Sequence, residues 1–276
     1  MIYIIFFTVS LLASTVGTIC GVGGGVFMKP ILDALGVLPV NTITFLSSCT
    51  VFSMACYNVF SSISFKNNNQ SENLIDWNLT SWLAIGGALG GLLGTSVYSS
   101  IRDSSSNPEF VGGYQAIALL IAVMMTLIYT TNRTKVKGMR LKNPILLIVL
   151  GVFLGTISSF VGIGGGPINL AVLYFFFSMP TKVAAANSLY IILISQSTSL
   201  LSNLMTRNIP QGILSFDKQL WMMMVGMIIC GVCGGILGKS VNRKLSSQKV
   251  DQLFNILCIV IMGLCVYNAL TKFSLI

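Results

Sequence analysis

The sequence predicts an all-α, polytopic membrane protein with two inverted-topology repeats, each with a Gly-broken or re-entrant helix and three full transmembrane helices. Three observations predict this fold class. Hydrophobic residues make up 54% of the 276 residues and charged residues only 8%, with a mean hydropathy of +0.85, whereas an ordinary soluble domain is about 25% charged. A glycine cluster within an apolar stretch occurs twice, and the basic residues gather in two loops.

Transmembrane helices are expected where apolar runs are long enough to cross about 30 Å of hydrocarbon. The runs of this length are Ile2 to Ile19, Ile43 to Phe65, Trp77 to Ser99, Gly113 to Thr130, Pro144 to Val161, Val183 to Met205, Leu220 to Leu237 and Val250 to Leu270. Two shorter runs, Val26 to Leu38 and Pro167 to Met179, follow the glycine clusters. At about 1.5 Å per residue these are too short to cross alone, so they are predicted to be half-helices or re-entrant segments.

The net charge of +9 is interpreted as an orientation signal, in preference to a nucleic-acid-binding surface. Residues 133–143 form a basic linker without an acidic residue, and a second basic loop runs from Lys239 to Lys249. By the positive-inside rule both face the cytoplasm. Counting crossings then places the 66–76 loop inside, and both termini and the 102–109 and 207–218 loops outside. The first apolar run lacks the basic residues and cleavage site of a secretion signal, so it is expected to be retained.

An internal repeat divides the chain into a first transmembrane repeat, 1–132, and a second, 144–276, on either side of the linker. The cluster that starts at Gly21 returns 141 residues later at Gly162, with Pro39 matching Pro180. Further on the offset becomes 144, with Trp77 matching Trp221. Because equivalent loops fall on opposite sides in the charge count, the copies are predicted to be inverted, which is a common organisation of secondary transporters.

The glycine clusters are predicted to break their helices and to form a substrate site near the membrane midplane. Glycine costs about 1 kcal/mol in a helix relative to alanine, and a helix that restarts inside the membrane exposes unpaired amides and the positive end of its dipole. Such an end attracts an anion, and the residues predicted to bind it are Gly23, Gly24, Gly25, Gly164, Gly165 and Gly166. The alternative is helix packing, which is the preferred interpretation for Gly87, Gly90, Gly91 and Gly94 and for Gly231, Gly234, Gly235 and Gly238.

Neutral polar residues on the helices after each break are candidates to complete the site. The favoured ones are Ser47, Asn187 and Ser188, together with Gln196. Others nearby are Asn41, Thr42, Thr44, Ser48, Ser195 and Ser197. For each residue, hydrogen bonding between helices is an equally good interpretation.

Two charged residues, Lys29 and Asp33, lie four residues apart on the first half-helix. This spacing favours an ion pair or a lysine that extends to the interface. The alternative is that Lys29 adds positive charge to an anion path. The repeat gives that alternative no support, because the equivalent residue is Leu170.

Enzyme chemistry is not expected, so no catalytic residue, metal site or cofactor is predicted. The chain has no histidine, which excludes histidine triads and H-E-x-x-H zinc sites. The run Cys233 to Ser240 resembles a Walker A loop but has cysteine in place of its first glycine. The pair Cys230 and Cys233 leaves open a membrane thiol-disulfide oxidoreductase, although both residues are better explained as small apolar packing residues.

The paired motifs resemble the TauE/SafE sulfite exporter family. They are Gly21-x-Gly-Gly-Gly-x-x-x-x-Pro30-x-Leu32, Leu35-Gly36-x-x-Pro39, Gly162-x-Gly-Gly-Gly-Pro167, Met179-Pro180 and Ala186-Asn187-Ser188. The resemblance covers nearly the whole chain, and it implies a multi-pass inner-membrane permease for small sulfur-containing anions such as sulfite or organosulfonates. The chain departs from the family pattern at Ala171 and Lys29.

A negative cell interior favours the exit of an anion by about 2.3 kcal/mol per charge and 100 mV, so export without strong ion coupling is expected. The expected partners are the lipid bilayer and the substrate, with no nucleic acid and a possible homo-oligomer. An anion channel with the same site is a further alternative.

Overall fold

The computed structural model describes residues 2–66, 75–104, 108–132, 139, 141, 143–161, 165–205, 210–215 and 217–273. The described residues form helices and connecting turns, with no strand among them, which confirms the all-α prediction. The helices are α1 (Ile2–Cys20), α2 (Gly25–Ala34), α3 (Val40–Lys66), α4 (Trp77–Ser104), α5 (Pro108–Thr131), α6 (Pro144–Val161), α7 (Gly166–Phe177), α8 (Thr181–Met205), α9 (Gln211–Leu214), α10 (Lys218–Lys244) and α11 (Ser247–Lys272).

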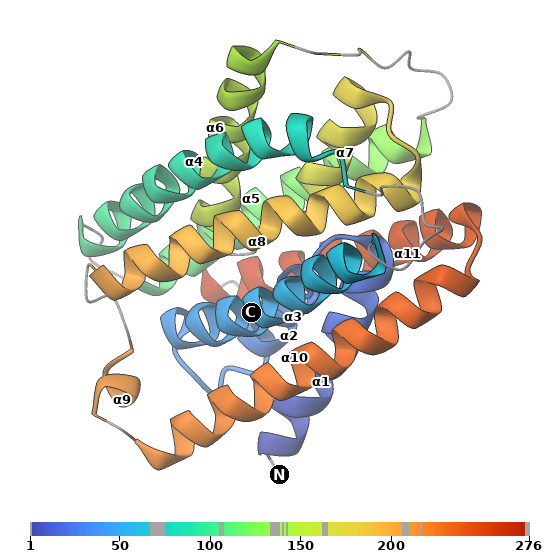
Figure 1. Cartoon of the computed structure of the whole chain (residues 1–276). Coiled ribbons are helices and arrows are strands. Elements are labelled where there is room, and N and C mark those ends of the chain that lie inside the picture. The colour runs from blue at the N-terminus through green and yellow to red at the C-terminus, as the bar shows by residue number, and fades with distance from the viewer. Residues whose placement is uncertain are drawn as a thin grey trace.

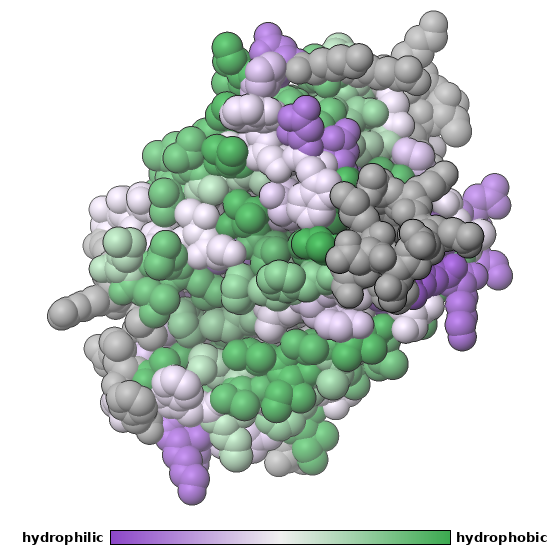
Figure 2. Space-filling model, viewed as in Figure 1, coloured by the Kyte–Doolittle hydropathy of each residue, from purple (hydrophilic) through white to green (hydrophobic). Residues whose placement is uncertain are grey.

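Eight of these helices are long and apolar enough to cross a membrane, and they match the eight predicted spans. Most of these eight helices begin or end a few residues outside the apolar run that predicted them. Capping explains two starts, since the side chains of Asp217 and Ser246 accept hydrogen bonds from the backbone at the beginning of α10 and α11. Apolar side chains cover most of the visible face, and polar residues lie mainly towards its rim (Figure 2). The protein is therefore a multi-pass membrane protein.

The helix breaks lie where the glycine clusters predict them. α1 ends at Cys20 and α2 begins at Gly25, with positive φ angles of 74° at Gly21 and 75° at Gly23. The second break follows Val161, and α7 begins directly after Gly165, whose φ is 86°. Glycine adopts these left-handed angles without the steric cost that a side chain brings. The helices after the breaks, α2 with 10 residues and α7 with 12, are shorter than the eight candidate spans, as expected for half-helices.

Glycine ridges let two pairs of helices approach closely. On α4, a Cβ added at Gly90 would touch the carbonyl group of Val152 on α6. On α10, a Cβ at Gly234 would lie 2.7 Å from the carbonyl oxygen of Leu11 on α1. These contacts confirm the packing interpretation of both later glycine sets, since small residues allow membrane helices to pack backbone to backbone.

Helices of the first part of the chain pack against helices of the second part, and equivalent helices of the two parts do so in the same way. α4 packs against α6 and α8, and α10 packs against α1 and α3. α3 and α8 lie side by side in the middle of the molecule (Figure 1), where Val51, Met54, Leu189 and Ile192 form a small apolar cluster. They run antiparallel, because the first turns of α3 and the last turns of α8 line one pocket. In an inverted repeat, equivalent helices such as α3 and α8 run in opposite directions. The inverted relation between the two complete repeats stays a prediction.

Candidate functional site

The two helix breaks touch each other in the middle of the protein. A Cβ added at Gly166, the first residue of α7, would overlap the carbonyl oxygen of Val22 in the first break. A Cβ at Gly21 would overlap Ala185 on α8. Neither position leaves room for a side chain, so the glycines bring the two interrupted helices within backbone contact.

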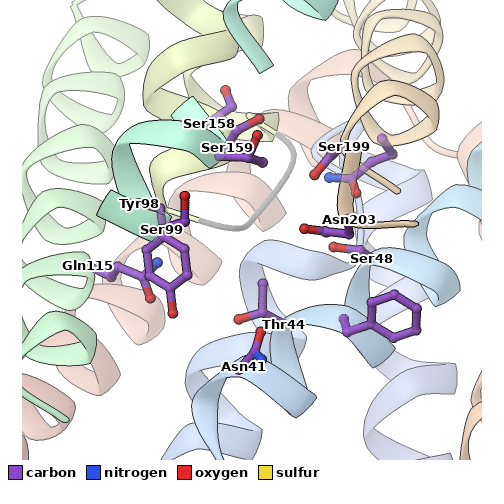
Figure 3. A pocket seen from close by; sticks show the side chains of 13 residues that line it. Asn41, Thr44, Ser48, Tyr98, Ser99, Gln115, Ser158, Ser159, Ser199 and Asn203 are labelled. Carbon is purple, nitrogen blue, oxygen red and sulfur yellow. The ribbon is translucent and has the colours of Figure 1, made fainter. Parts of the chain in front are cut away.

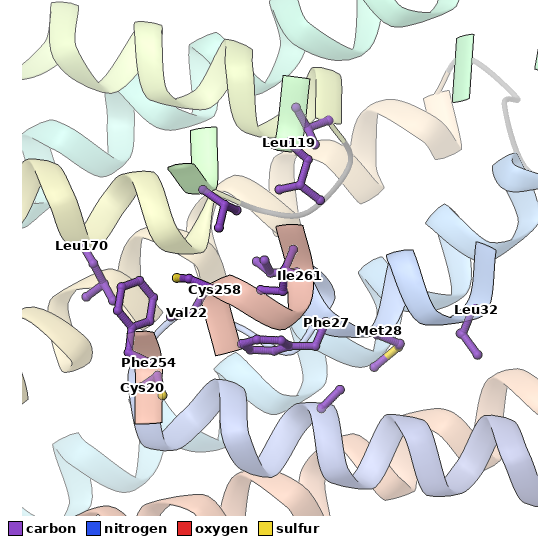
Figure 4. Close-up of a cluster of buried hydrophobic side chains, with 14 of the residues drawn as sticks. Cys20, Val22, Phe27, Met28, Leu32, Leu119, Leu170, Phe254, Cys258 and Ile261 are labelled. Carbon is purple, nitrogen blue, oxygen red and sulfur yellow. The ribbon is translucent and has the colours of Figure 1, made fainter. Parts of the chain in front are cut away.

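The two breaks differ in their surroundings. Val22 lies in a dry core with Cys20, Phe27, Phe254 and Cys258 (Figure 4), and all five are buried. The hydrogen bonds of α2 begin with the amides of Phe27 and Met28, both of which donate to the carbonyl of Gly24, so the preceding amides have no partner within the helix.

The second break faces polar groups instead. A Cβ added at Gly165 would touch the hydroxyl of Ser158 and lie 3.0 Å from the amide oxygen of Asn169. α7 begins at this point with Pro167 in its first turn, a position where the missing amide proton costs nothing. The N-terminal end of α7 therefore lies next to side chains that can form hydrogen bonds with a ligand.

A polar pocket extends from this point between helices of both halves (Figure 3). It encloses about 590 Å³ of empty space, part of it open to solvent. Its described lining residues come from α3, α4, α5, α6 and α8: Asn41, Thr44, Phe45, Ser48, Thr95, Tyr98, Ser99, Gln115, Ser158, Ser159, Gln196, Ser199 and Asn203. All except Phe45 carry hydroxyl or amide groups, and none of them is charged. Such a wall can donate hydrogen bonds to a small anion without binding it irreversibly.

The predicted site residues are not all at this pocket. Gln196 lines it, is 5% exposed, and its Oε1 has no hydrogen-bond partner in the described part of the chain. Gly165 reaches the pocket through Ser158, and Gly166 lies between the breaks. Gly23, Gly24 and Gly25 are buried at the first break, and Gly164 falls outside the described residues.

The favoured serines on α3 and α8 lie on faces that turn towards the interior. Ser188 is fully buried, and its hydroxyl lacks a partner among the described groups. It lies one turn from Ala185, which contacts Gly21, and one turn from Ile192, which lies 3.1 Å from the Cβ position of Gly23. Its face of α8 therefore packs along the first break. Ser47 is also buried and donates 3.0 Å to the carbonyl of Thr44 on its own helix.

Asn187 has a structural arrangement of hydrogen bonds. Its Oδ1 accepts from the Asp76 amide at 2.9 Å and from the Thr80 hydroxyl at 2.5 Å, and its Nδ2 donates to the Val183 carbonyl at 2.7 Å. It joins the beginning of α4 to α8. In this structure Asn187 forms hydrogen bonds between helices. This is the alternative interpretation given above for each polar residue.

Several pocket residues were not among the predicted ones: Thr95, Tyr98, Ser99, Gln115, Ser158, Ser159, Ser199 and Asn203. One signal was available, because Ser158 and Ser159 come directly before the second glycine cluster. The others are hydroxyl and amide residues on long membrane helices, and their spacing does not reveal which neighbour they face.

Lys29 does not form the expected ion pair with Asp33. It is 4% exposed, and its ammonium donates 2.8 Å bonds to Gln115 Oε1 and to the carbonyl oxygen of Val161, the last residue of α6. Nor does it extend to the interface. Asp33 Oδ1 is buried without a hydrogen-bond partner among the described residues.

The positions equivalent to the pocket in the other half hold polar side chains that bond to one another. The repeat offsets relate Thr95, Ser199 and Asn203 of the pocket to Lys239, Asn58 and Ser62. There the Lys239 ammonium donates to the Asn58 carbonyl at 3.2 Å and to the Ser62 hydroxyl at 2.9 Å. Asn58 Nδ2 in turn donates to the Thr18 hydroxyl at 3.1 Å. The position equivalent to Thr95 in the pocket is thus occupied by a lysine that bonds to α3.

Comparison with known proteins agrees with this architecture. The sequence model described as "Sulfite exporter TauE/SafE" matches residues 6–264. The chain belongs to the TauE/SafE sulfite exporter family. A relative, "Probable membrane transporter protein YunE" of Bacillus subtilis (strain 168), is 21% identical over 282 residues, covering 98% of this chain and 99% of the relative. No solved structure matches the chain significantly.

Membership of the TauE/SafE family identifies the chain as a membrane transporter. The family match spans both breaks and every helix that lines the pocket. The predicted family and transport class are confirmed, and the pocket supplies a physical candidate for the transport site.

Proposed function

We propose that this TauE/SafE protein is a permease that exports small sulfur-containing anions, such as sulfite or organosulfonates, across the inner (plasma) membrane. The observation that carries the proposal is the uncharged polar pocket that ends at the second break, beside Gly165 and the beginning of α7. The substrate class is supported by the family name and by the chemistry of the pocket.

The hydroxyls of Thr44, Thr95, Ser99 and Ser158 already donate to backbone carbonyls of their own helices. The pocket still suits an oxyanion, because Asn41, Ser48, Ser159, Gln196, Ser199 and Asn203 can donate to it and no carboxylate lies among the described lining residues. Sulfite and sulfonates present several oxygen acceptors on one sulfur, which hydroxyl and amide groups can share. The N-terminal end of α7 adds about half a positive charge from its dipole. Glycine at position 165 allows a ligand to approach the backbone, because no Cβ stands in the way.

Alternating access is the proposed mechanism, since one half contains a polar pocket while at the equivalent positions of the other half Lys239 bonds to Asn58 and Ser62. The predicted orientation places the ends of α4 and α8 on the outside, so the pocket opens outward and the Lys239 contacts close the cytoplasmic side. An anion channel needs a continuous open path, whereas a carrier opens one side at a time. In the opposite state, the Lys239 contacts would break and the pocket beside Gln196 would close.

The membrane potential favours one direction of transport. Export of a monoanion from a negative interior is favoured by about 2.3 kcal/mol per 100 mV. Import would need a coupled cation, and the pocket wall offers no carboxylate to bind one among its described residues. The membrane potential and the absence of a carboxylate among the described lining residues support the proposal of net export by uniport.

Counterflow of radiolabelled sulfite in proteoliposomes tests the proposal. The matched pair is Gln196→Ala, which alters the pocket wall, and Ser197→Ala, its neighbour, whose hydroxyl donates 2.7 Å to the Leu193 carbonyl on its own helix. Gln196→Ala and Gly165→Leu should lower counterflow at least several-fold, and Ser197→Ala should leave it near the unmodified rate. Competition by sulfoacetate, thiosulfate and sulfate ranks the substrates. Absence of counterflow for every anion in well-folded protein would disprove the proposal.

A further inference from the structure

The end of α6 at the second break is held by two side chains from the first part of the chain. The carbonyls of Phe160 and Val161 have no partner within the helix, because the helix ends there. Gln115 Nε2 on α5 donates to the Phe160 oxygen at 2.7 Å, and the Lys29 ammonium on α2 donates to the Val161 oxygen at 2.8 Å. Together the two side chains fix the point at which the second break begins.

Lys29 and Gln115 are also bonded to each other. Gln115 Oε1 accepts from the Lys29 ammonium at 2.8 Å, and both side chains are buried. The orientation of a glutamine amide is usually open, since its oxygen and nitrogen ends have nearly the same shape. Here the orientation is fixed, because an ammonium group can only donate and a carbonyl oxygen can only accept. The nitrogen end of the amide therefore stays turned towards the end of α6.

The fixed amide leaves one donor at the polar pocket. Its nitrogen carries two N–H groups, of which one is bonded to Phe160, and the other has no acceptor among the described residues. Gln115 lines the pocket (Figure 3) together with Ser158 and Ser159, which lie just before the end of α6. A donor that is already oriented loses little conformational freedom when a ligand binds. The Oε1 of Gln196 has no partner in the described structure to orient its amide, so Gln115 is the better-oriented donor of the two.

We propose that Gln115 donates a hydrogen bond to the anion bound at the second break, and that Lys29 is the positioning residue that orients it. This inference rests on the proposed function, because it assigns a ligand contact in the same pocket. Lys29 acts on the anion through the amide and does not itself contact it. At the equivalent position in the second half the residue is Leu170, which is buried in the apolar core, so the repeat does not duplicate this lysine.

Binding measured without transport tests the inference separately from the proposed function. Purified protein in detergent is titrated with sodium methanesulfonate at an ionic strength held constant with sodium gluconate. The dissociation constant follows from thermal stabilisation, since a ligand that binds only the folded state raises the unfolding midpoint. Gln115→Met keeps the length of the side chain and adds no charge. It should raise the constant about 10- to 100-fold, the range for a lost hydrogen bond to a charged group.

Asn268→Leu is the matched control. The Nδ2 of Asn268 donates to the Pro30 carbonyl on α2 at 2.9 Å, and Asn268 lines the smaller cavity beside Lys29 but is not among the described lining residues of the polar pocket. The control therefore removes a buried hydrogen bond to α2 without changing the proposed contact. It should lower the unfolding midpoint of the ligand-free protein and leave the dissociation constant close to the unmodified value. Equal effects of Gln115→Met and Asn268→Leu on this constant would overturn the inference.

A double-mutant cycle separates the orienting role of Lys29 from a contribution to stability. In Lys29→Met the Gln115 amide is free to turn over, so methanesulfonate should bind several-fold more weakly. Lys29→Arg also donates, and it should restore most of the affinity. In a Gln115→Met background, Lys29→Met should change the dissociation constant little, since the donor that it orients is gone. A merely structural role would weaken binding equally in both backgrounds, and that result would overturn the assignment of Lys29.

Gln115→Glu decides the matter if Lys29→Met does not fold. The carboxylate keeps the bond from Lys29 but has no N–H for the ligand, so methanesulfonate binding should be lost while the fold is kept. Binding at the unmodified level would contradict the inference. No binding of methanesulfonate to the unmodified protein would overturn the inference together with the pocket, whereas binding in the expected pattern without counterflow would disprove only the proposed transport.

Discussion

The carbonyl oxygen of Val22 lies where a side chain on Gly166 would begin. These residues are 144 positions apart in the sequence, and they join the two helix breaks directly. The contact makes the geometry of each break depend on the other, since neither can shift without moving its neighbour.

Gly166→Ala should therefore destabilise the protein. The methyl group would overlap the Val22 carbonyl, and overpacking of this kind costs about 1–3 kcal/mol. The control is Gly263→Ala, where an added Cβ meets nothing within 4 Å and the helix gains up to about 1 kcal/mol from the better propensity of alanine. Thermal unfolding in detergent is the measurement. Equal unfolding midpoints for the two variants would contradict the contact.

Gly90→Ala should loosen the packing of α4 against α6. Its Cβ would touch the Val152 carbonyl, whereas a Cβ at Gly87 on the same helix would be 3.8 Å from Ile191 and 3.9 Å from the Gly151 carbonyl, which is ordinary contact. Gly90→Ala should lower the unfolding midpoint by several degrees, and Gly87→Ala should change it little. The prediction is wrong if the order of the two midpoints is reversed.

Lys239→Met should loosen the last turns of α3. The change removes the hydrogen bonds from the ammonium to the Asn58 carbonyl and the Ser62 hydroxyl. Amides in the last turns of α3 should then exchange with deuterium faster, as followed by mass spectrometry, because local opening becomes easier. Lys244→Met, at an exposed lysine on the last turn of the same helix, is the control. Identical exchange in the two variants would show that Lys239 does not stabilise the last turns of α3.

Replacement of both Cys230 and Cys233 by alanine should leave sulfite counterflow within about twofold of the unmodified rate. The two thiols are free, and Cys233 is exposed on the outer surface of α10. Neither residue lines the polar pocket. Loss of counterflow in the folded variant would favour the thiol-disulfide oxidoreductase alternative, and dithiol-dependent reduction of a quinone would establish it.

The spans and breaks could be predicted because their signals are local. A long apolar run has one stable form in a bilayer, and Gly21, Gly23 and Gly165 adopt backbone angles that favour glycine. The pocket wall could not be predicted in the same way. A serine or threonine on a membrane helix often bonds to its own backbone, as Thr44 does to Val40 at 2.8 Å, so its sequence position does not reveal its neighbours.

Lys29 shows the limit of spacing arguments most clearly. A lysine and an aspartate four residues apart normally pair on one helix face. Its two partners, Gln115 and Val161, are instead 86 and 132 residues away, on helices that only the tertiary fold brings close. The burial of α2 between α1, α3 and α11 turns the lysine inward, and no pattern within α2 records that packing.

The packing of α1, from the first part of the chain, against α10, from the second part, has a consequence for biosynthesis. α1 leaves the ribosome long before its main partner, α10, which ends at Lys244. At about 5–20 residues per second, translation takes roughly 10–45 s to supply it. During that time the glycine-facing side of α1 remains in contact with lipid or with the insertion machinery. The nascent protein must therefore keep α1 unassembled until α10 has been synthesised, and the transport pathway can form only after that.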